Sequence, residues 1–427
     1  MKLWTMFRLA VLGLLGSLPV SGGAAAAPES PAPVVRVADF AALSAAVRAL
    51  ATSPTGGTIL LQGGHYLARQ PLVLDRAGNA APIRIWAEPG ATVVLDFSAW
   101  RTVASTDARG HGITLAGDDY HLKGLTIEKA GSFGILISGS HNLVENCVTR
   151  YNGNTGLQIG LPGKVENPGR LPSQNVIRNC DSYRNFDPYA IRSDTGKPAP
   201  GNDADGFGCR SNPGPDNRFE GCRAWENADD GWDFYRSAVP TEVVRCWSWH
   251  EGDPKVFTGE YDRENGQPRD PNLFDLGQPH IAVPGTTVAQ HMAGWAGNGN
   301  GFKLGGERNA GQPTVIDCLA FDHHYGRSGT TGFTENNNRG KIVLTGCTAF
   351  DNHRNFSLPY AAATAGMLVF TDDLGFDGQL PDALGAFGGS VTVPSPAAQK
   401  RIVAAVREAV RAPRKADGSL PDLVIPR

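Results

Sequence analysis

Four aspartates in two short turns, together with a lysine farther along the chain, are the residues whose types and spacing could do chemistry. They are Asp205, Asp229, Asp230, Asp233 and Lys303. Four carboxylates held close together repel one another unless a cation lies among them, and this number of hard oxygen donors suits Ca²⁺ better than Zn²⁺. A neighbouring cation also lowers the pKa of a lysine, so that the amine can act as a base. The set therefore predicts a calcium site beside a poised amine, provided that the fold brings the five residues together.

A repeated phrase in the sequence indicates how they come together. The phrase is a short polar turn that ends in glycine, followed by apolar residues at the first and third positions after the glycine. Its copies begin at Gly134, Gly156, Gly206, Gly231, Gly301 and Gly332, and only the last departs from the pattern, with Glu335 at the third position. Such alternation is typical of a strand with one buried face, and stacked repeats align equal offsets in columns. Asp205 and Asp230 then share one outward column, and Lys303 lies one rung beyond Asp233. Taken singly, Asp-Gly turns are ordinary, and a metal there could be purely structural.

A second strand precedes most of these glycines and carries a cysteine, with an asparagine five residues later. The clearest pairs are Cys147/Asn152, Cys180/Asn185, Cys222/Asn227 and Cys347/Asn352. An asparagine amide at a bend can hydrogen-bond the backbone of neighbouring turns. The pattern predicts an all-β fold, a right-handed parallel β-helix with Ile135, Leu157, Phe207, Trp232 and Phe302 stacked inside. The seven cysteines are interpreted as small buried apolar residues, with disulfides between adjacent turns as the alternative.

The chain divides into three predicted parts. Residues 1–27 have a basic start, an apolar run and an alanine-rich end, which predicts a secretory signal peptide. Residues 28–360 form the predicted β-helix catalytic domain, and residues 361–427 a C-terminal extension that packs on or caps it. Within these parts, residues 37–50 predict a capping helix that begins after Asp39. Residues 251–296 are a polar insertion, loop by composition, on the same side as the aspartates.

The charge balance excludes some partners. Without Lys2 and Arg8, 37 basic residues face 42 acidic ones, a net charge of −5, and no basic tail indicates nucleic-acid binding. We expect a secreted, monomeric protein with no membrane anchor once the signal peptide is removed. An acidic protein does not attract a polyanion by its overall field, so an acidic substrate has to be held by local cations. The candidates are Arg210, Arg236 and Arg308.

Calcium beside a neutral amine suits β-elimination on a uronic acid polymer. The metal neutralises the C6 carboxylate and makes the C5 proton acidic, while lysine removes that proton and the C4 oxygen leaves. Hydrolysis would instead need two carboxylates set apart as acid and base. Two other hypotheses remain: a lyase for another uronan, such as glucuronan, alginate or modified pectin, and a non-catalytic glycan-binding β-helix.

Three runs of sequence together resemble the family 9 polysaccharide lyases, which are right-handed β-helix pectate lyases. They are residues 204–207, residues 222–233 and residues 299–306. The resemblance covers about residues 36–360 and implies activity on polygalacturonate. It also implies that the four aspartates are calcium ligands and that Lys303 is the base. Arg210 stands where this family is expected to have lysine, and the insertion between Asp233 and Lys303 is longer than usual.

Overall fold

The computed structural model describes residues 32–76, 81–101, 110–161, 169–307, 309–327, 329–363, 366–379 and 391–425. The predicted signal peptide at residues 1–27 and the candidate Arg308 lie outside the described residues. From Pro33 onward the chain forms a single compact unit.

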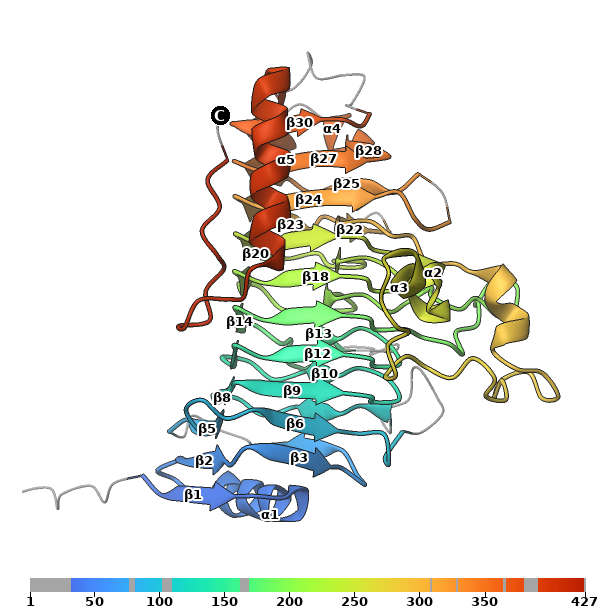
Figure 1. Ribbon diagram of the computed structural model, residues 1–427. Helices are drawn as coiled ribbons and strands as arrows, with labels where there is room; N and C mark the ends of the chain where they lie inside the picture. Colours follow the sequence, from blue (N-terminus) through green and yellow to red (C-terminus); the bar gives the residue numbers. More distant parts are fainter. Residues whose placement is uncertain are drawn as a thin grey trace, which may run out of the picture. The chain divides into compact units, whose positions relative to one another are not determined.

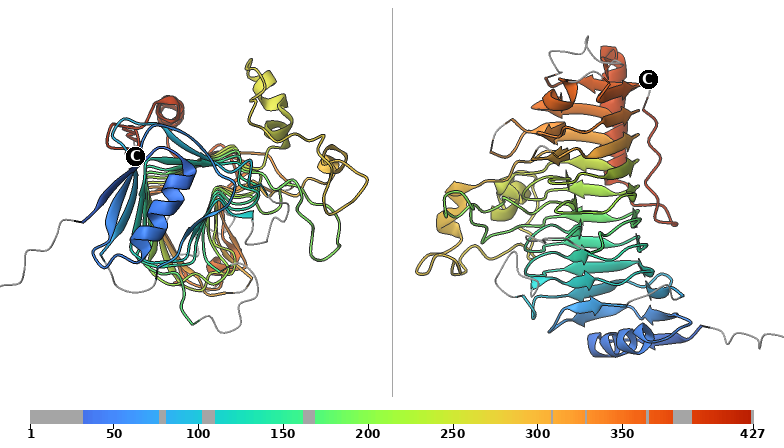
Figure 2. Two further views of the ribbon diagram at one scale, coloured as in Figure 1. Left: turned by 90° about the horizontal axis from the view of Figure 1, so that it is seen from below. Right: turned by 180° about the vertical axis from the view of Figure 1, so that it is seen from behind.

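This unit is a right-handed parallel β-helix, as the sequence predicts (Figure 1, Figure 2). Each complete turn gives one strand to each of three parallel sheets, and within the described residues the turns at the two ends lack a strand in the third. The first sheet contains β1 (Val34–Val37), β2 (Gly57–Leu61), β5 (Ile83–Ala87), β8 (Tyr120–Lys123), β11 (Leu143–Glu145), β14 (Val176–Arg178), β17 (Asn217–Glu220), β20 (Pro240–Val244), β23 (Gln312–Ile316), β26 (Ile342–Thr345) and β29 (Leu368–Thr371). The second sheet contains β3 (Gly64–Leu67), β6 (Val93–Asp96), β9 (Leu125–Glu128), β12 (Val148–Arg150), β15 (Asp181–Tyr183), β18 (Arg223–Trp225), β21 (Trp247–Trp249), β24 (Leu319–His323), β27 (Thr348–Asn352), β30 (Asp373–Phe376) and β31 (Val391–Thr392). The third sheet contains β4 (Leu72–Leu74), β7 (Ile113–Leu115), β10 (Ile135–Ile137), β13 (Leu157–Ile159), β16 (Phe207–Cys209), β19 (Trp232–Asp233), β22 (Phe302–Gly306), β25 (Thr331–Asn336) and β28 (Arg354–Ser357).

The interior of the third sheet is a continuous stack of apolar side chains. Ile135 pairs with Leu157, and Leu157 pairs with Phe207 in the next turn. The ring centroids of Phe207 and Trp232 lie 4.9 Å apart, and those of Trp232 and Phe302 lie 4.6 Å apart. All five side chains are buried, and burial of such large apolar surfaces is the main stabilising contribution to the fold. The predicted stack and its register are confirmed.

A column of amides lies at the corner between the second and third sheets. Asn185 Oδ1 accepts hydrogen bonds from the backbone N and Nδ2 of Asn152, at 3.1 and 3.0 Å. Asn227 Oδ1 accepts the same pair of bonds from Asn185, at 3.2 and 2.8 Å. Glu251 takes the next place and accepts from the backbone N of Asn227 at 2.7 Å. We call Asn152, Asn185 and Asn227 the amide column, and they confirm the predicted role of these asparagines.

The seven cysteines are buried free thiols. Six of them follow one another at the corner between the first and second sheets, where several thiols contact a carbonyl oxygen of the backbone. This confirms their interpretation as small interior residues, and the disulfide alternative is wrong for the described chain.

A helix covers the first turn of the β-helix, as predicted. It is α1 (Phe40–Ala51), and the Asp39 side chain caps it by accepting from the backbone N of Ala42 at 2.8 Å. At the other end, α4 (Pro359–Ala362) precedes the last turns, and α5 (Pro396–Arg411) lies along the outer face of the second sheet (Figure 1). No helix within the described ranges is long and apolar enough to cross a membrane.

The insertion differs from its prediction as plain loop. It contains α2 (Pro254–Thr258), α3 (Glu260–Glu264) and the 3₁₀ helix η2 (Ala289–Gly294). The local reason is a capping signal that composition does not reveal, because the Asp253 side chain accepts from the backbone N of Lys255 and proline follows at the first helical position. The insertion projects from the corner between the second and third sheets (Figure 1, Figure 2). It is therefore on the same side as the aspartates, as the sequence indicates.

Candidate functional site

Strands β16, β19 and β22 position the five candidate residues. Asp205 lies two residues before β16, and Asp230 lies two residues before β19. Asp233, the last residue of β19, pairs in register with Lys303 of β22. Because side chains alternate along a strand, this register places both side chains on the outer face of the third sheet. The structure therefore brings together all five residues that the sequence singled out.

The lysine lies inside the carboxylate cluster. Its Nζ atom is 2.6 Å from Asp230 Oδ2 and 3.3 Å from Asp233 Oδ2. On the other side of the cluster, Asp205, Asp229 and Asp230 each offer a carboxylate oxygen within 4.8 Å of the others. Asp230 thus belongs both to this trio and to the lysine contact. We call these four aspartates, with Lys303, the acidic cluster.

Hydrogen bonds link the acidic cluster to neighbouring turns in a second column. Asp205 Oδ1 accepts from the backbone N of Asp230 at 3.2 Å, and Asp230 Oδ1 accepts from the backbone N of Asn300 at 3.0 Å. At the two ends, Thr155 donates to Asp205 Oδ2 at 2.9 Å, and Asn300 Oδ1 accepts from the backbone N of Thr331 at 2.9 Å. We call these five residues the carboxylate column. Thr155 and Asn300 were not predicted as site residues, although they share the offset of the aspartates from the repeated glycine.

The aspartates are more deeply buried than an outward-facing turn suggests. Asp205 and Asp230 are 0% exposed, and Lys303 is 7% exposed. A cover is provided by the segment directly after the insertion, where the backbone N of Asn298 donates to Asp229 at 2.6 Å. The sequence did not reveal this cover because the path of the insertion depends on its tertiary contacts.

Burial and mutual repulsion change the pKa values in the cluster. Burial raises the pKa of Asp205 to about 8, despite the opposing effect of Arg210. Burial and then the neighbouring Asp230 raise the pKa of Asp229 well above its usual range. Burial alone would lower the pKa of Lys303, but Asp230 and the other carboxylates outweigh it and hold that pKa well above its ordinary value. Without a bound cation the amine is therefore protonated.

Arg210 is a member of this site that was predicted for a different role. Its Nη1 atom lies 3.1 Å from Asp233 Oδ2 and 3.4 Å from Asp205 Oδ2. Its other nitrogens donate to Gln158 Oε1 and to the Thr155 hydroxyl. The guanidinium is thus held by the protein, and substrate binding by Arg210 stays a prediction. Its position directly after β16, in the same turn as Asp205, could have suggested this pairing.

The donor set suits a divalent cation. Four carboxylates face two cations, Lys303 and Arg210, so the ionised set has a formal charge of −2. Carboxylate oxygens are the ligands that Ca²⁺ prefers, and a charge of +2 would balance the set. The residues present therefore fit calcium, although their roles as ligands stay a prediction.

Arg236 lies apart from this cluster. Its side chain is more than half exposed and pairs with Glu307, with 2.5 Å between Nε and Oε2. It is thus on the surface near the site, and its predicted contact with substrate is untested.

Comparisons with known proteins agree with this architecture. The family model described as "Pel9A-like, right handed beta helix region" matches residues 36–268. Pectate lyase L of Dickeya dadantii (strain 3937) is 30% identical over 319 residues, which cover 72% of this chain and 60% of the relative. Pectate lyase L of Paenibacillus polymyxa (strain SC2) is 32% identical over 338 residues, which cover 78% of this chain and 64% of the relative. The chain thus spans less than two thirds of the length of these curated relatives.

Solved structures show the same fold. The crystal structure of pectate lyase Pel9A matches with a TM-score of 0.66 at 24% identity, over 92% of this chain and 88% of that one. A rhamnogalacturonan lyase matches with a TM-score of 0.56 at 21% identity, over 88% of this chain and 90% of that one. These likenesses extend the agreement in fold beyond the residues matched by the family model.

Proposed function

Because the chain belongs to the Pel9A-like right-handed β-helix family, we propose that it is a secreted, calcium-dependent pectate lyase that cleaves polygalacturonate by β-elimination. The observation that carries the proposal is a lysine amine inside a buried cluster of four carboxylates, with Nζ 2.6 Å from Asp230. The printed names of the two curated relatives support the reaction type and the substrate.

The reaction assigns a separate task to each part of the site. Asp205, Asp229, Asp230 and Asp233 would hold the cation. Calcium bound there would neutralise the C6 carboxylate of a galacturonate and make its C5 proton more acidic. Lys303 takes that proton, the C4–O bond breaks, and a double bond forms between C4 and C5. The departing oxygen takes a proton from water, so the new ends are an unsaturated uronide and a hydroxyl.

The protonation of Lys303 explains why the carboxylates must be neutralised first. A base has to be neutral to accept a proton, and the surrounding aspartates favour the charged amine. A calcium ion bound by these aspartates would neutralise much of their negative charge. The charged amine of Lys303 would then be less stabilised, and its pKa would fall. Arg210 keeps its own proton, so it balances Asp205 and Asp233 without competing as a base.

A spectrophotometric assay tests the proposal. Purified protein is mixed with polygalacturonate, with added calcium or with a chelator, and the ultraviolet absorbance of the conjugated double bond is followed. We expect absorbance to rise with calcium, to stop with chelator and to resume when calcium is restored. Glucuronan, alginate and methyl-esterified pectin are assayed in parallel to identify the preferred uronan. Binding of polygalacturonate without any unsaturated product would instead favour a glycan-binding β-helix.

A further inference from the structure

A cavity on the same side of the molecule as the acidic cluster has no part in the chemistry described above. It has a volume of about 420 Å³ and lies between the insertion and the early turns of the β-helix. Its lining includes Ser98, Arg101, Lys129, Tyr189, Asn272 and Phe274. Arg101 and Lys129 come from the corner after β6 and β9, and Tyr189 comes from the loop after β15. The cavity is therefore built from three turns and closed by a fourth segment.

Arg101 is the unusual residue of this cavity. Its guanidinium lies 4.6 Å from the ring centroid of Phe274, and the residue is partly buried. Across the described ranges no carboxylate pairs with it, and burial lowers its pKa with only the Tyr189 hydroxyl opposing the effect. Lys129, in contrast, already pairs with Glu128 at 3.1 Å and Asp96 at 3.5 Å. Arg101 is thus the cation of this cavity that has no ion pair among the described residues, although Asp275 also lines the cavity.

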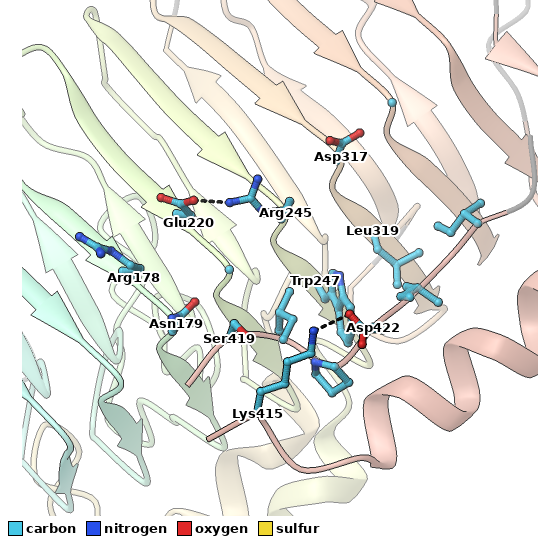
Figure 3. Close-up of a pocket in the computed structure, with 16 residues that line it drawn as sticks. Arg178, Asn179, Glu220, Arg245, Trp247, Asp317, Leu319, Lys415, Ser419 and Asp422 are labelled. Atoms are coloured by element: carbon cyan, nitrogen blue, oxygen red, sulfur yellow. Dashed lines mark hydrogen bonds and ion pairs between the residues drawn. The ribbon is translucent and has the colours of Figure 1, made fainter. Parts of the chain in front are cut away.

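The cavity under the C-terminal tail shows the contrasting arrangement (Figure 3). It is lined by three cations, each with an acidic partner. The pairs are Arg178 with Glu145, Arg245 with Glu220, and Lys415 with Asp422. The three cations of this cavity thus each have a partner, whereas a partly buried cation without an ion pair retains a desolvation cost that an anionic ligand would offset.

The cavity and the acidic cluster lie on one continuous face. Tyr189 and Asp205 are near opposite ends of the same loop between β15 and β16, and Asp187 Oδ2 accepts from the backbone N of Asp203 at 2.9 Å within that loop. In the third sheet, β10 and β16 are separated by one strand. Arg101 precedes β7, which is three strands from β16 and five from β22, so at about 4.8 Å per strand it is offset from Asp205 and Lys303 along the solenoid by roughly 14 and 24 Å.

We propose that this cavity is a distal subsite that binds the carboxylate of another uronic acid residue in the same polysaccharide chain. The inference rests on the proposed function, because the chain whose bond breaks at Lys303 would carry a carboxylate on every sugar. Arg101 offers a planar fork that matches a carboxylate in two hydrogen bonds. The rings of Phe274 and Tyr189, 5.6 Å apart and perpendicular, offer apolar surface to the sugar ring. Substrates long enough to reach both places then bind more tightly than short ones.

Affinity as a function of chain length tests this subsite. Trigalacturonate and hexagalacturonate are titrated into the Lys303→Ala protein with calcium, where cleavage does not interfere, and Michaelis constants are measured in the wild-type background. Arg101→Gln should weaken hexamer binding at least about tenfold more than trimer binding, because the lost contact is a charged pair. Arg101→Lys should lie between Arg101→Gln and wild type, since it keeps the charge and loses the fork. Arg245→Gln is the matched control and should leave both affinities unchanged.

The outcomes separate this inference from the proposed function. An unchanged ratio of trimer to hexamer affinity in Arg101→Gln, in a protein with wild-type thermal unfolding, overturns the subsite and leaves the lyase proposal intact. Equal weakening of both oligomers also overturns it, because the effect is then not distal. If wild type neither cleaves nor binds galacturonate oligomers, the proposed function fails, and the subsite fails with it.

Discussion

Two polar columns run side by side through one corner of this β-helix, and they meet opposite requirements. Asn227 of the amide column and Asp230 of the carboxylate column are only three residues apart in the same turn, and both are 0% exposed. Asn185 and Asn227 donate through Nδ2 and accept through Oδ1, so the amide column extends from turn to turn without charge. When ionised, Asp205 and Asp230 can only accept, so each then leaves negative charge that a cation must balance.

The difference shows how one stacking geometry serves both stability and chemistry. Neutral amides can stack because each supplies the donors that the next one needs. Carboxylates in the same geometry become a site for cations, and Lys303, Arg210 and the proposed calcium are suited to it. The predictions that follow test this contrast, beginning with the largest expected effect.

Replacement of Lys303 tests whether the carboxylate column positions a general base. Lys303→Arg keeps a cation beside Asp230 and Asp233 but holds its proton, because a guanidinium does not deprotonate in proteins. We expect a loss of turnover on polygalacturonate of about a thousandfold, within the usual range for a missing general base. Lys303→Ala should be similarly inactive, with calcium binding retained. Turnover near the wild-type value in Lys303→Arg would mean that the base lies elsewhere.

Conversion of one carboxylate into an amide would make the two columns alike. In Asp230→Asn the side-chain oxygen can still accept from the backbone N of Asn300, so the fold should persist. The cation would lose one charged ligand, and we expect calcium affinity to fall about a hundredfold, measured by calorimetry. Asn227→Gln is the control, because it changes the neighbouring column without changing charge near the cation. Unchanged calcium affinity in Asp230→Asn would count decisively against the ligand assignment.

Replacement of Asn185 tests how much the amide column contributes to the stability of the fold. Asn185→Ala removes the acceptor for the two bonds from Asn152 and removes the Nδ2 donor to Asn227 Oδ1, while the bond from the backbone N of residue 185 can persist. We expect the free energy of unfolding to fall by about 2 kcal/mol, since buried polar groups lose their partners. Calcium affinity should change little. Denaturant unfolding with chelator present gives the measurement, and a larger loss of calcium affinity than of stability would contradict the division between the columns.

A buried charge that is balanced by the protein offers a third case. Burial would lower the pKa of His250, but Asp253 and Asp322, bonded to its two ring nitrogens, outweigh burial and raise the pKa to about 9. The rings of Tyr261 and Tyr325 enclose the imidazole. Because the folded pKa lies above the unfolded value of about 6.5, the added stability is complete below pH ~6.5 and is lost as the pH rises through 9.

The expected size of this pH effect is about 3 kcal/mol of unfolding free energy between pH 6 and pH 10. His250→Gln should be less stable than wild type at pH 6 and should approach it at pH 10. Denaturant unfolding at the two pH values gives the measurement. A constant difference between the two proteins across this range would show that the imidazolium contributes nothing to stability.

How far the sequence predicted this molecule can be judged from individual residues. The pairing of Asp233 with Lys303 was predictable because the repeated glycine fixes the start of each strand and strand side chains alternate. The cover over Asp229 was not predictable. Asn298 contacts Asp229 just after a long insertion, and the path of that insertion depends on tertiary contacts. The pairing of Arg210 with Asp205 and Asp233 differs from the predicted contact with substrate, because a buried cluster of four carboxylates attracts a nearby cation of the protein itself.

The smallest effect is expected at Arg236, the exposed counterpart of Arg210. Both were predicted to bind uronate, but Arg210 is held between Asp205 and Asp233, whereas Arg236 pairs with Glu307 at the surface. Exposed ion pairs contribute little, and the Glu307 carboxylate repels the carboxylate of a substrate that approaches Arg236. Arg236→Ala should therefore raise the Michaelis constant less than about threefold and leave turnover unchanged. Glu307→Gln provides the paired test: if Arg236 does reach the substrate, release from Glu307 should lower the Michaelis constant, and Arg236→Ala should remove that gain. A tenfold or larger rise in Arg236→Ala alone would place this arginine in the substrate groove and end its contrast with Arg210.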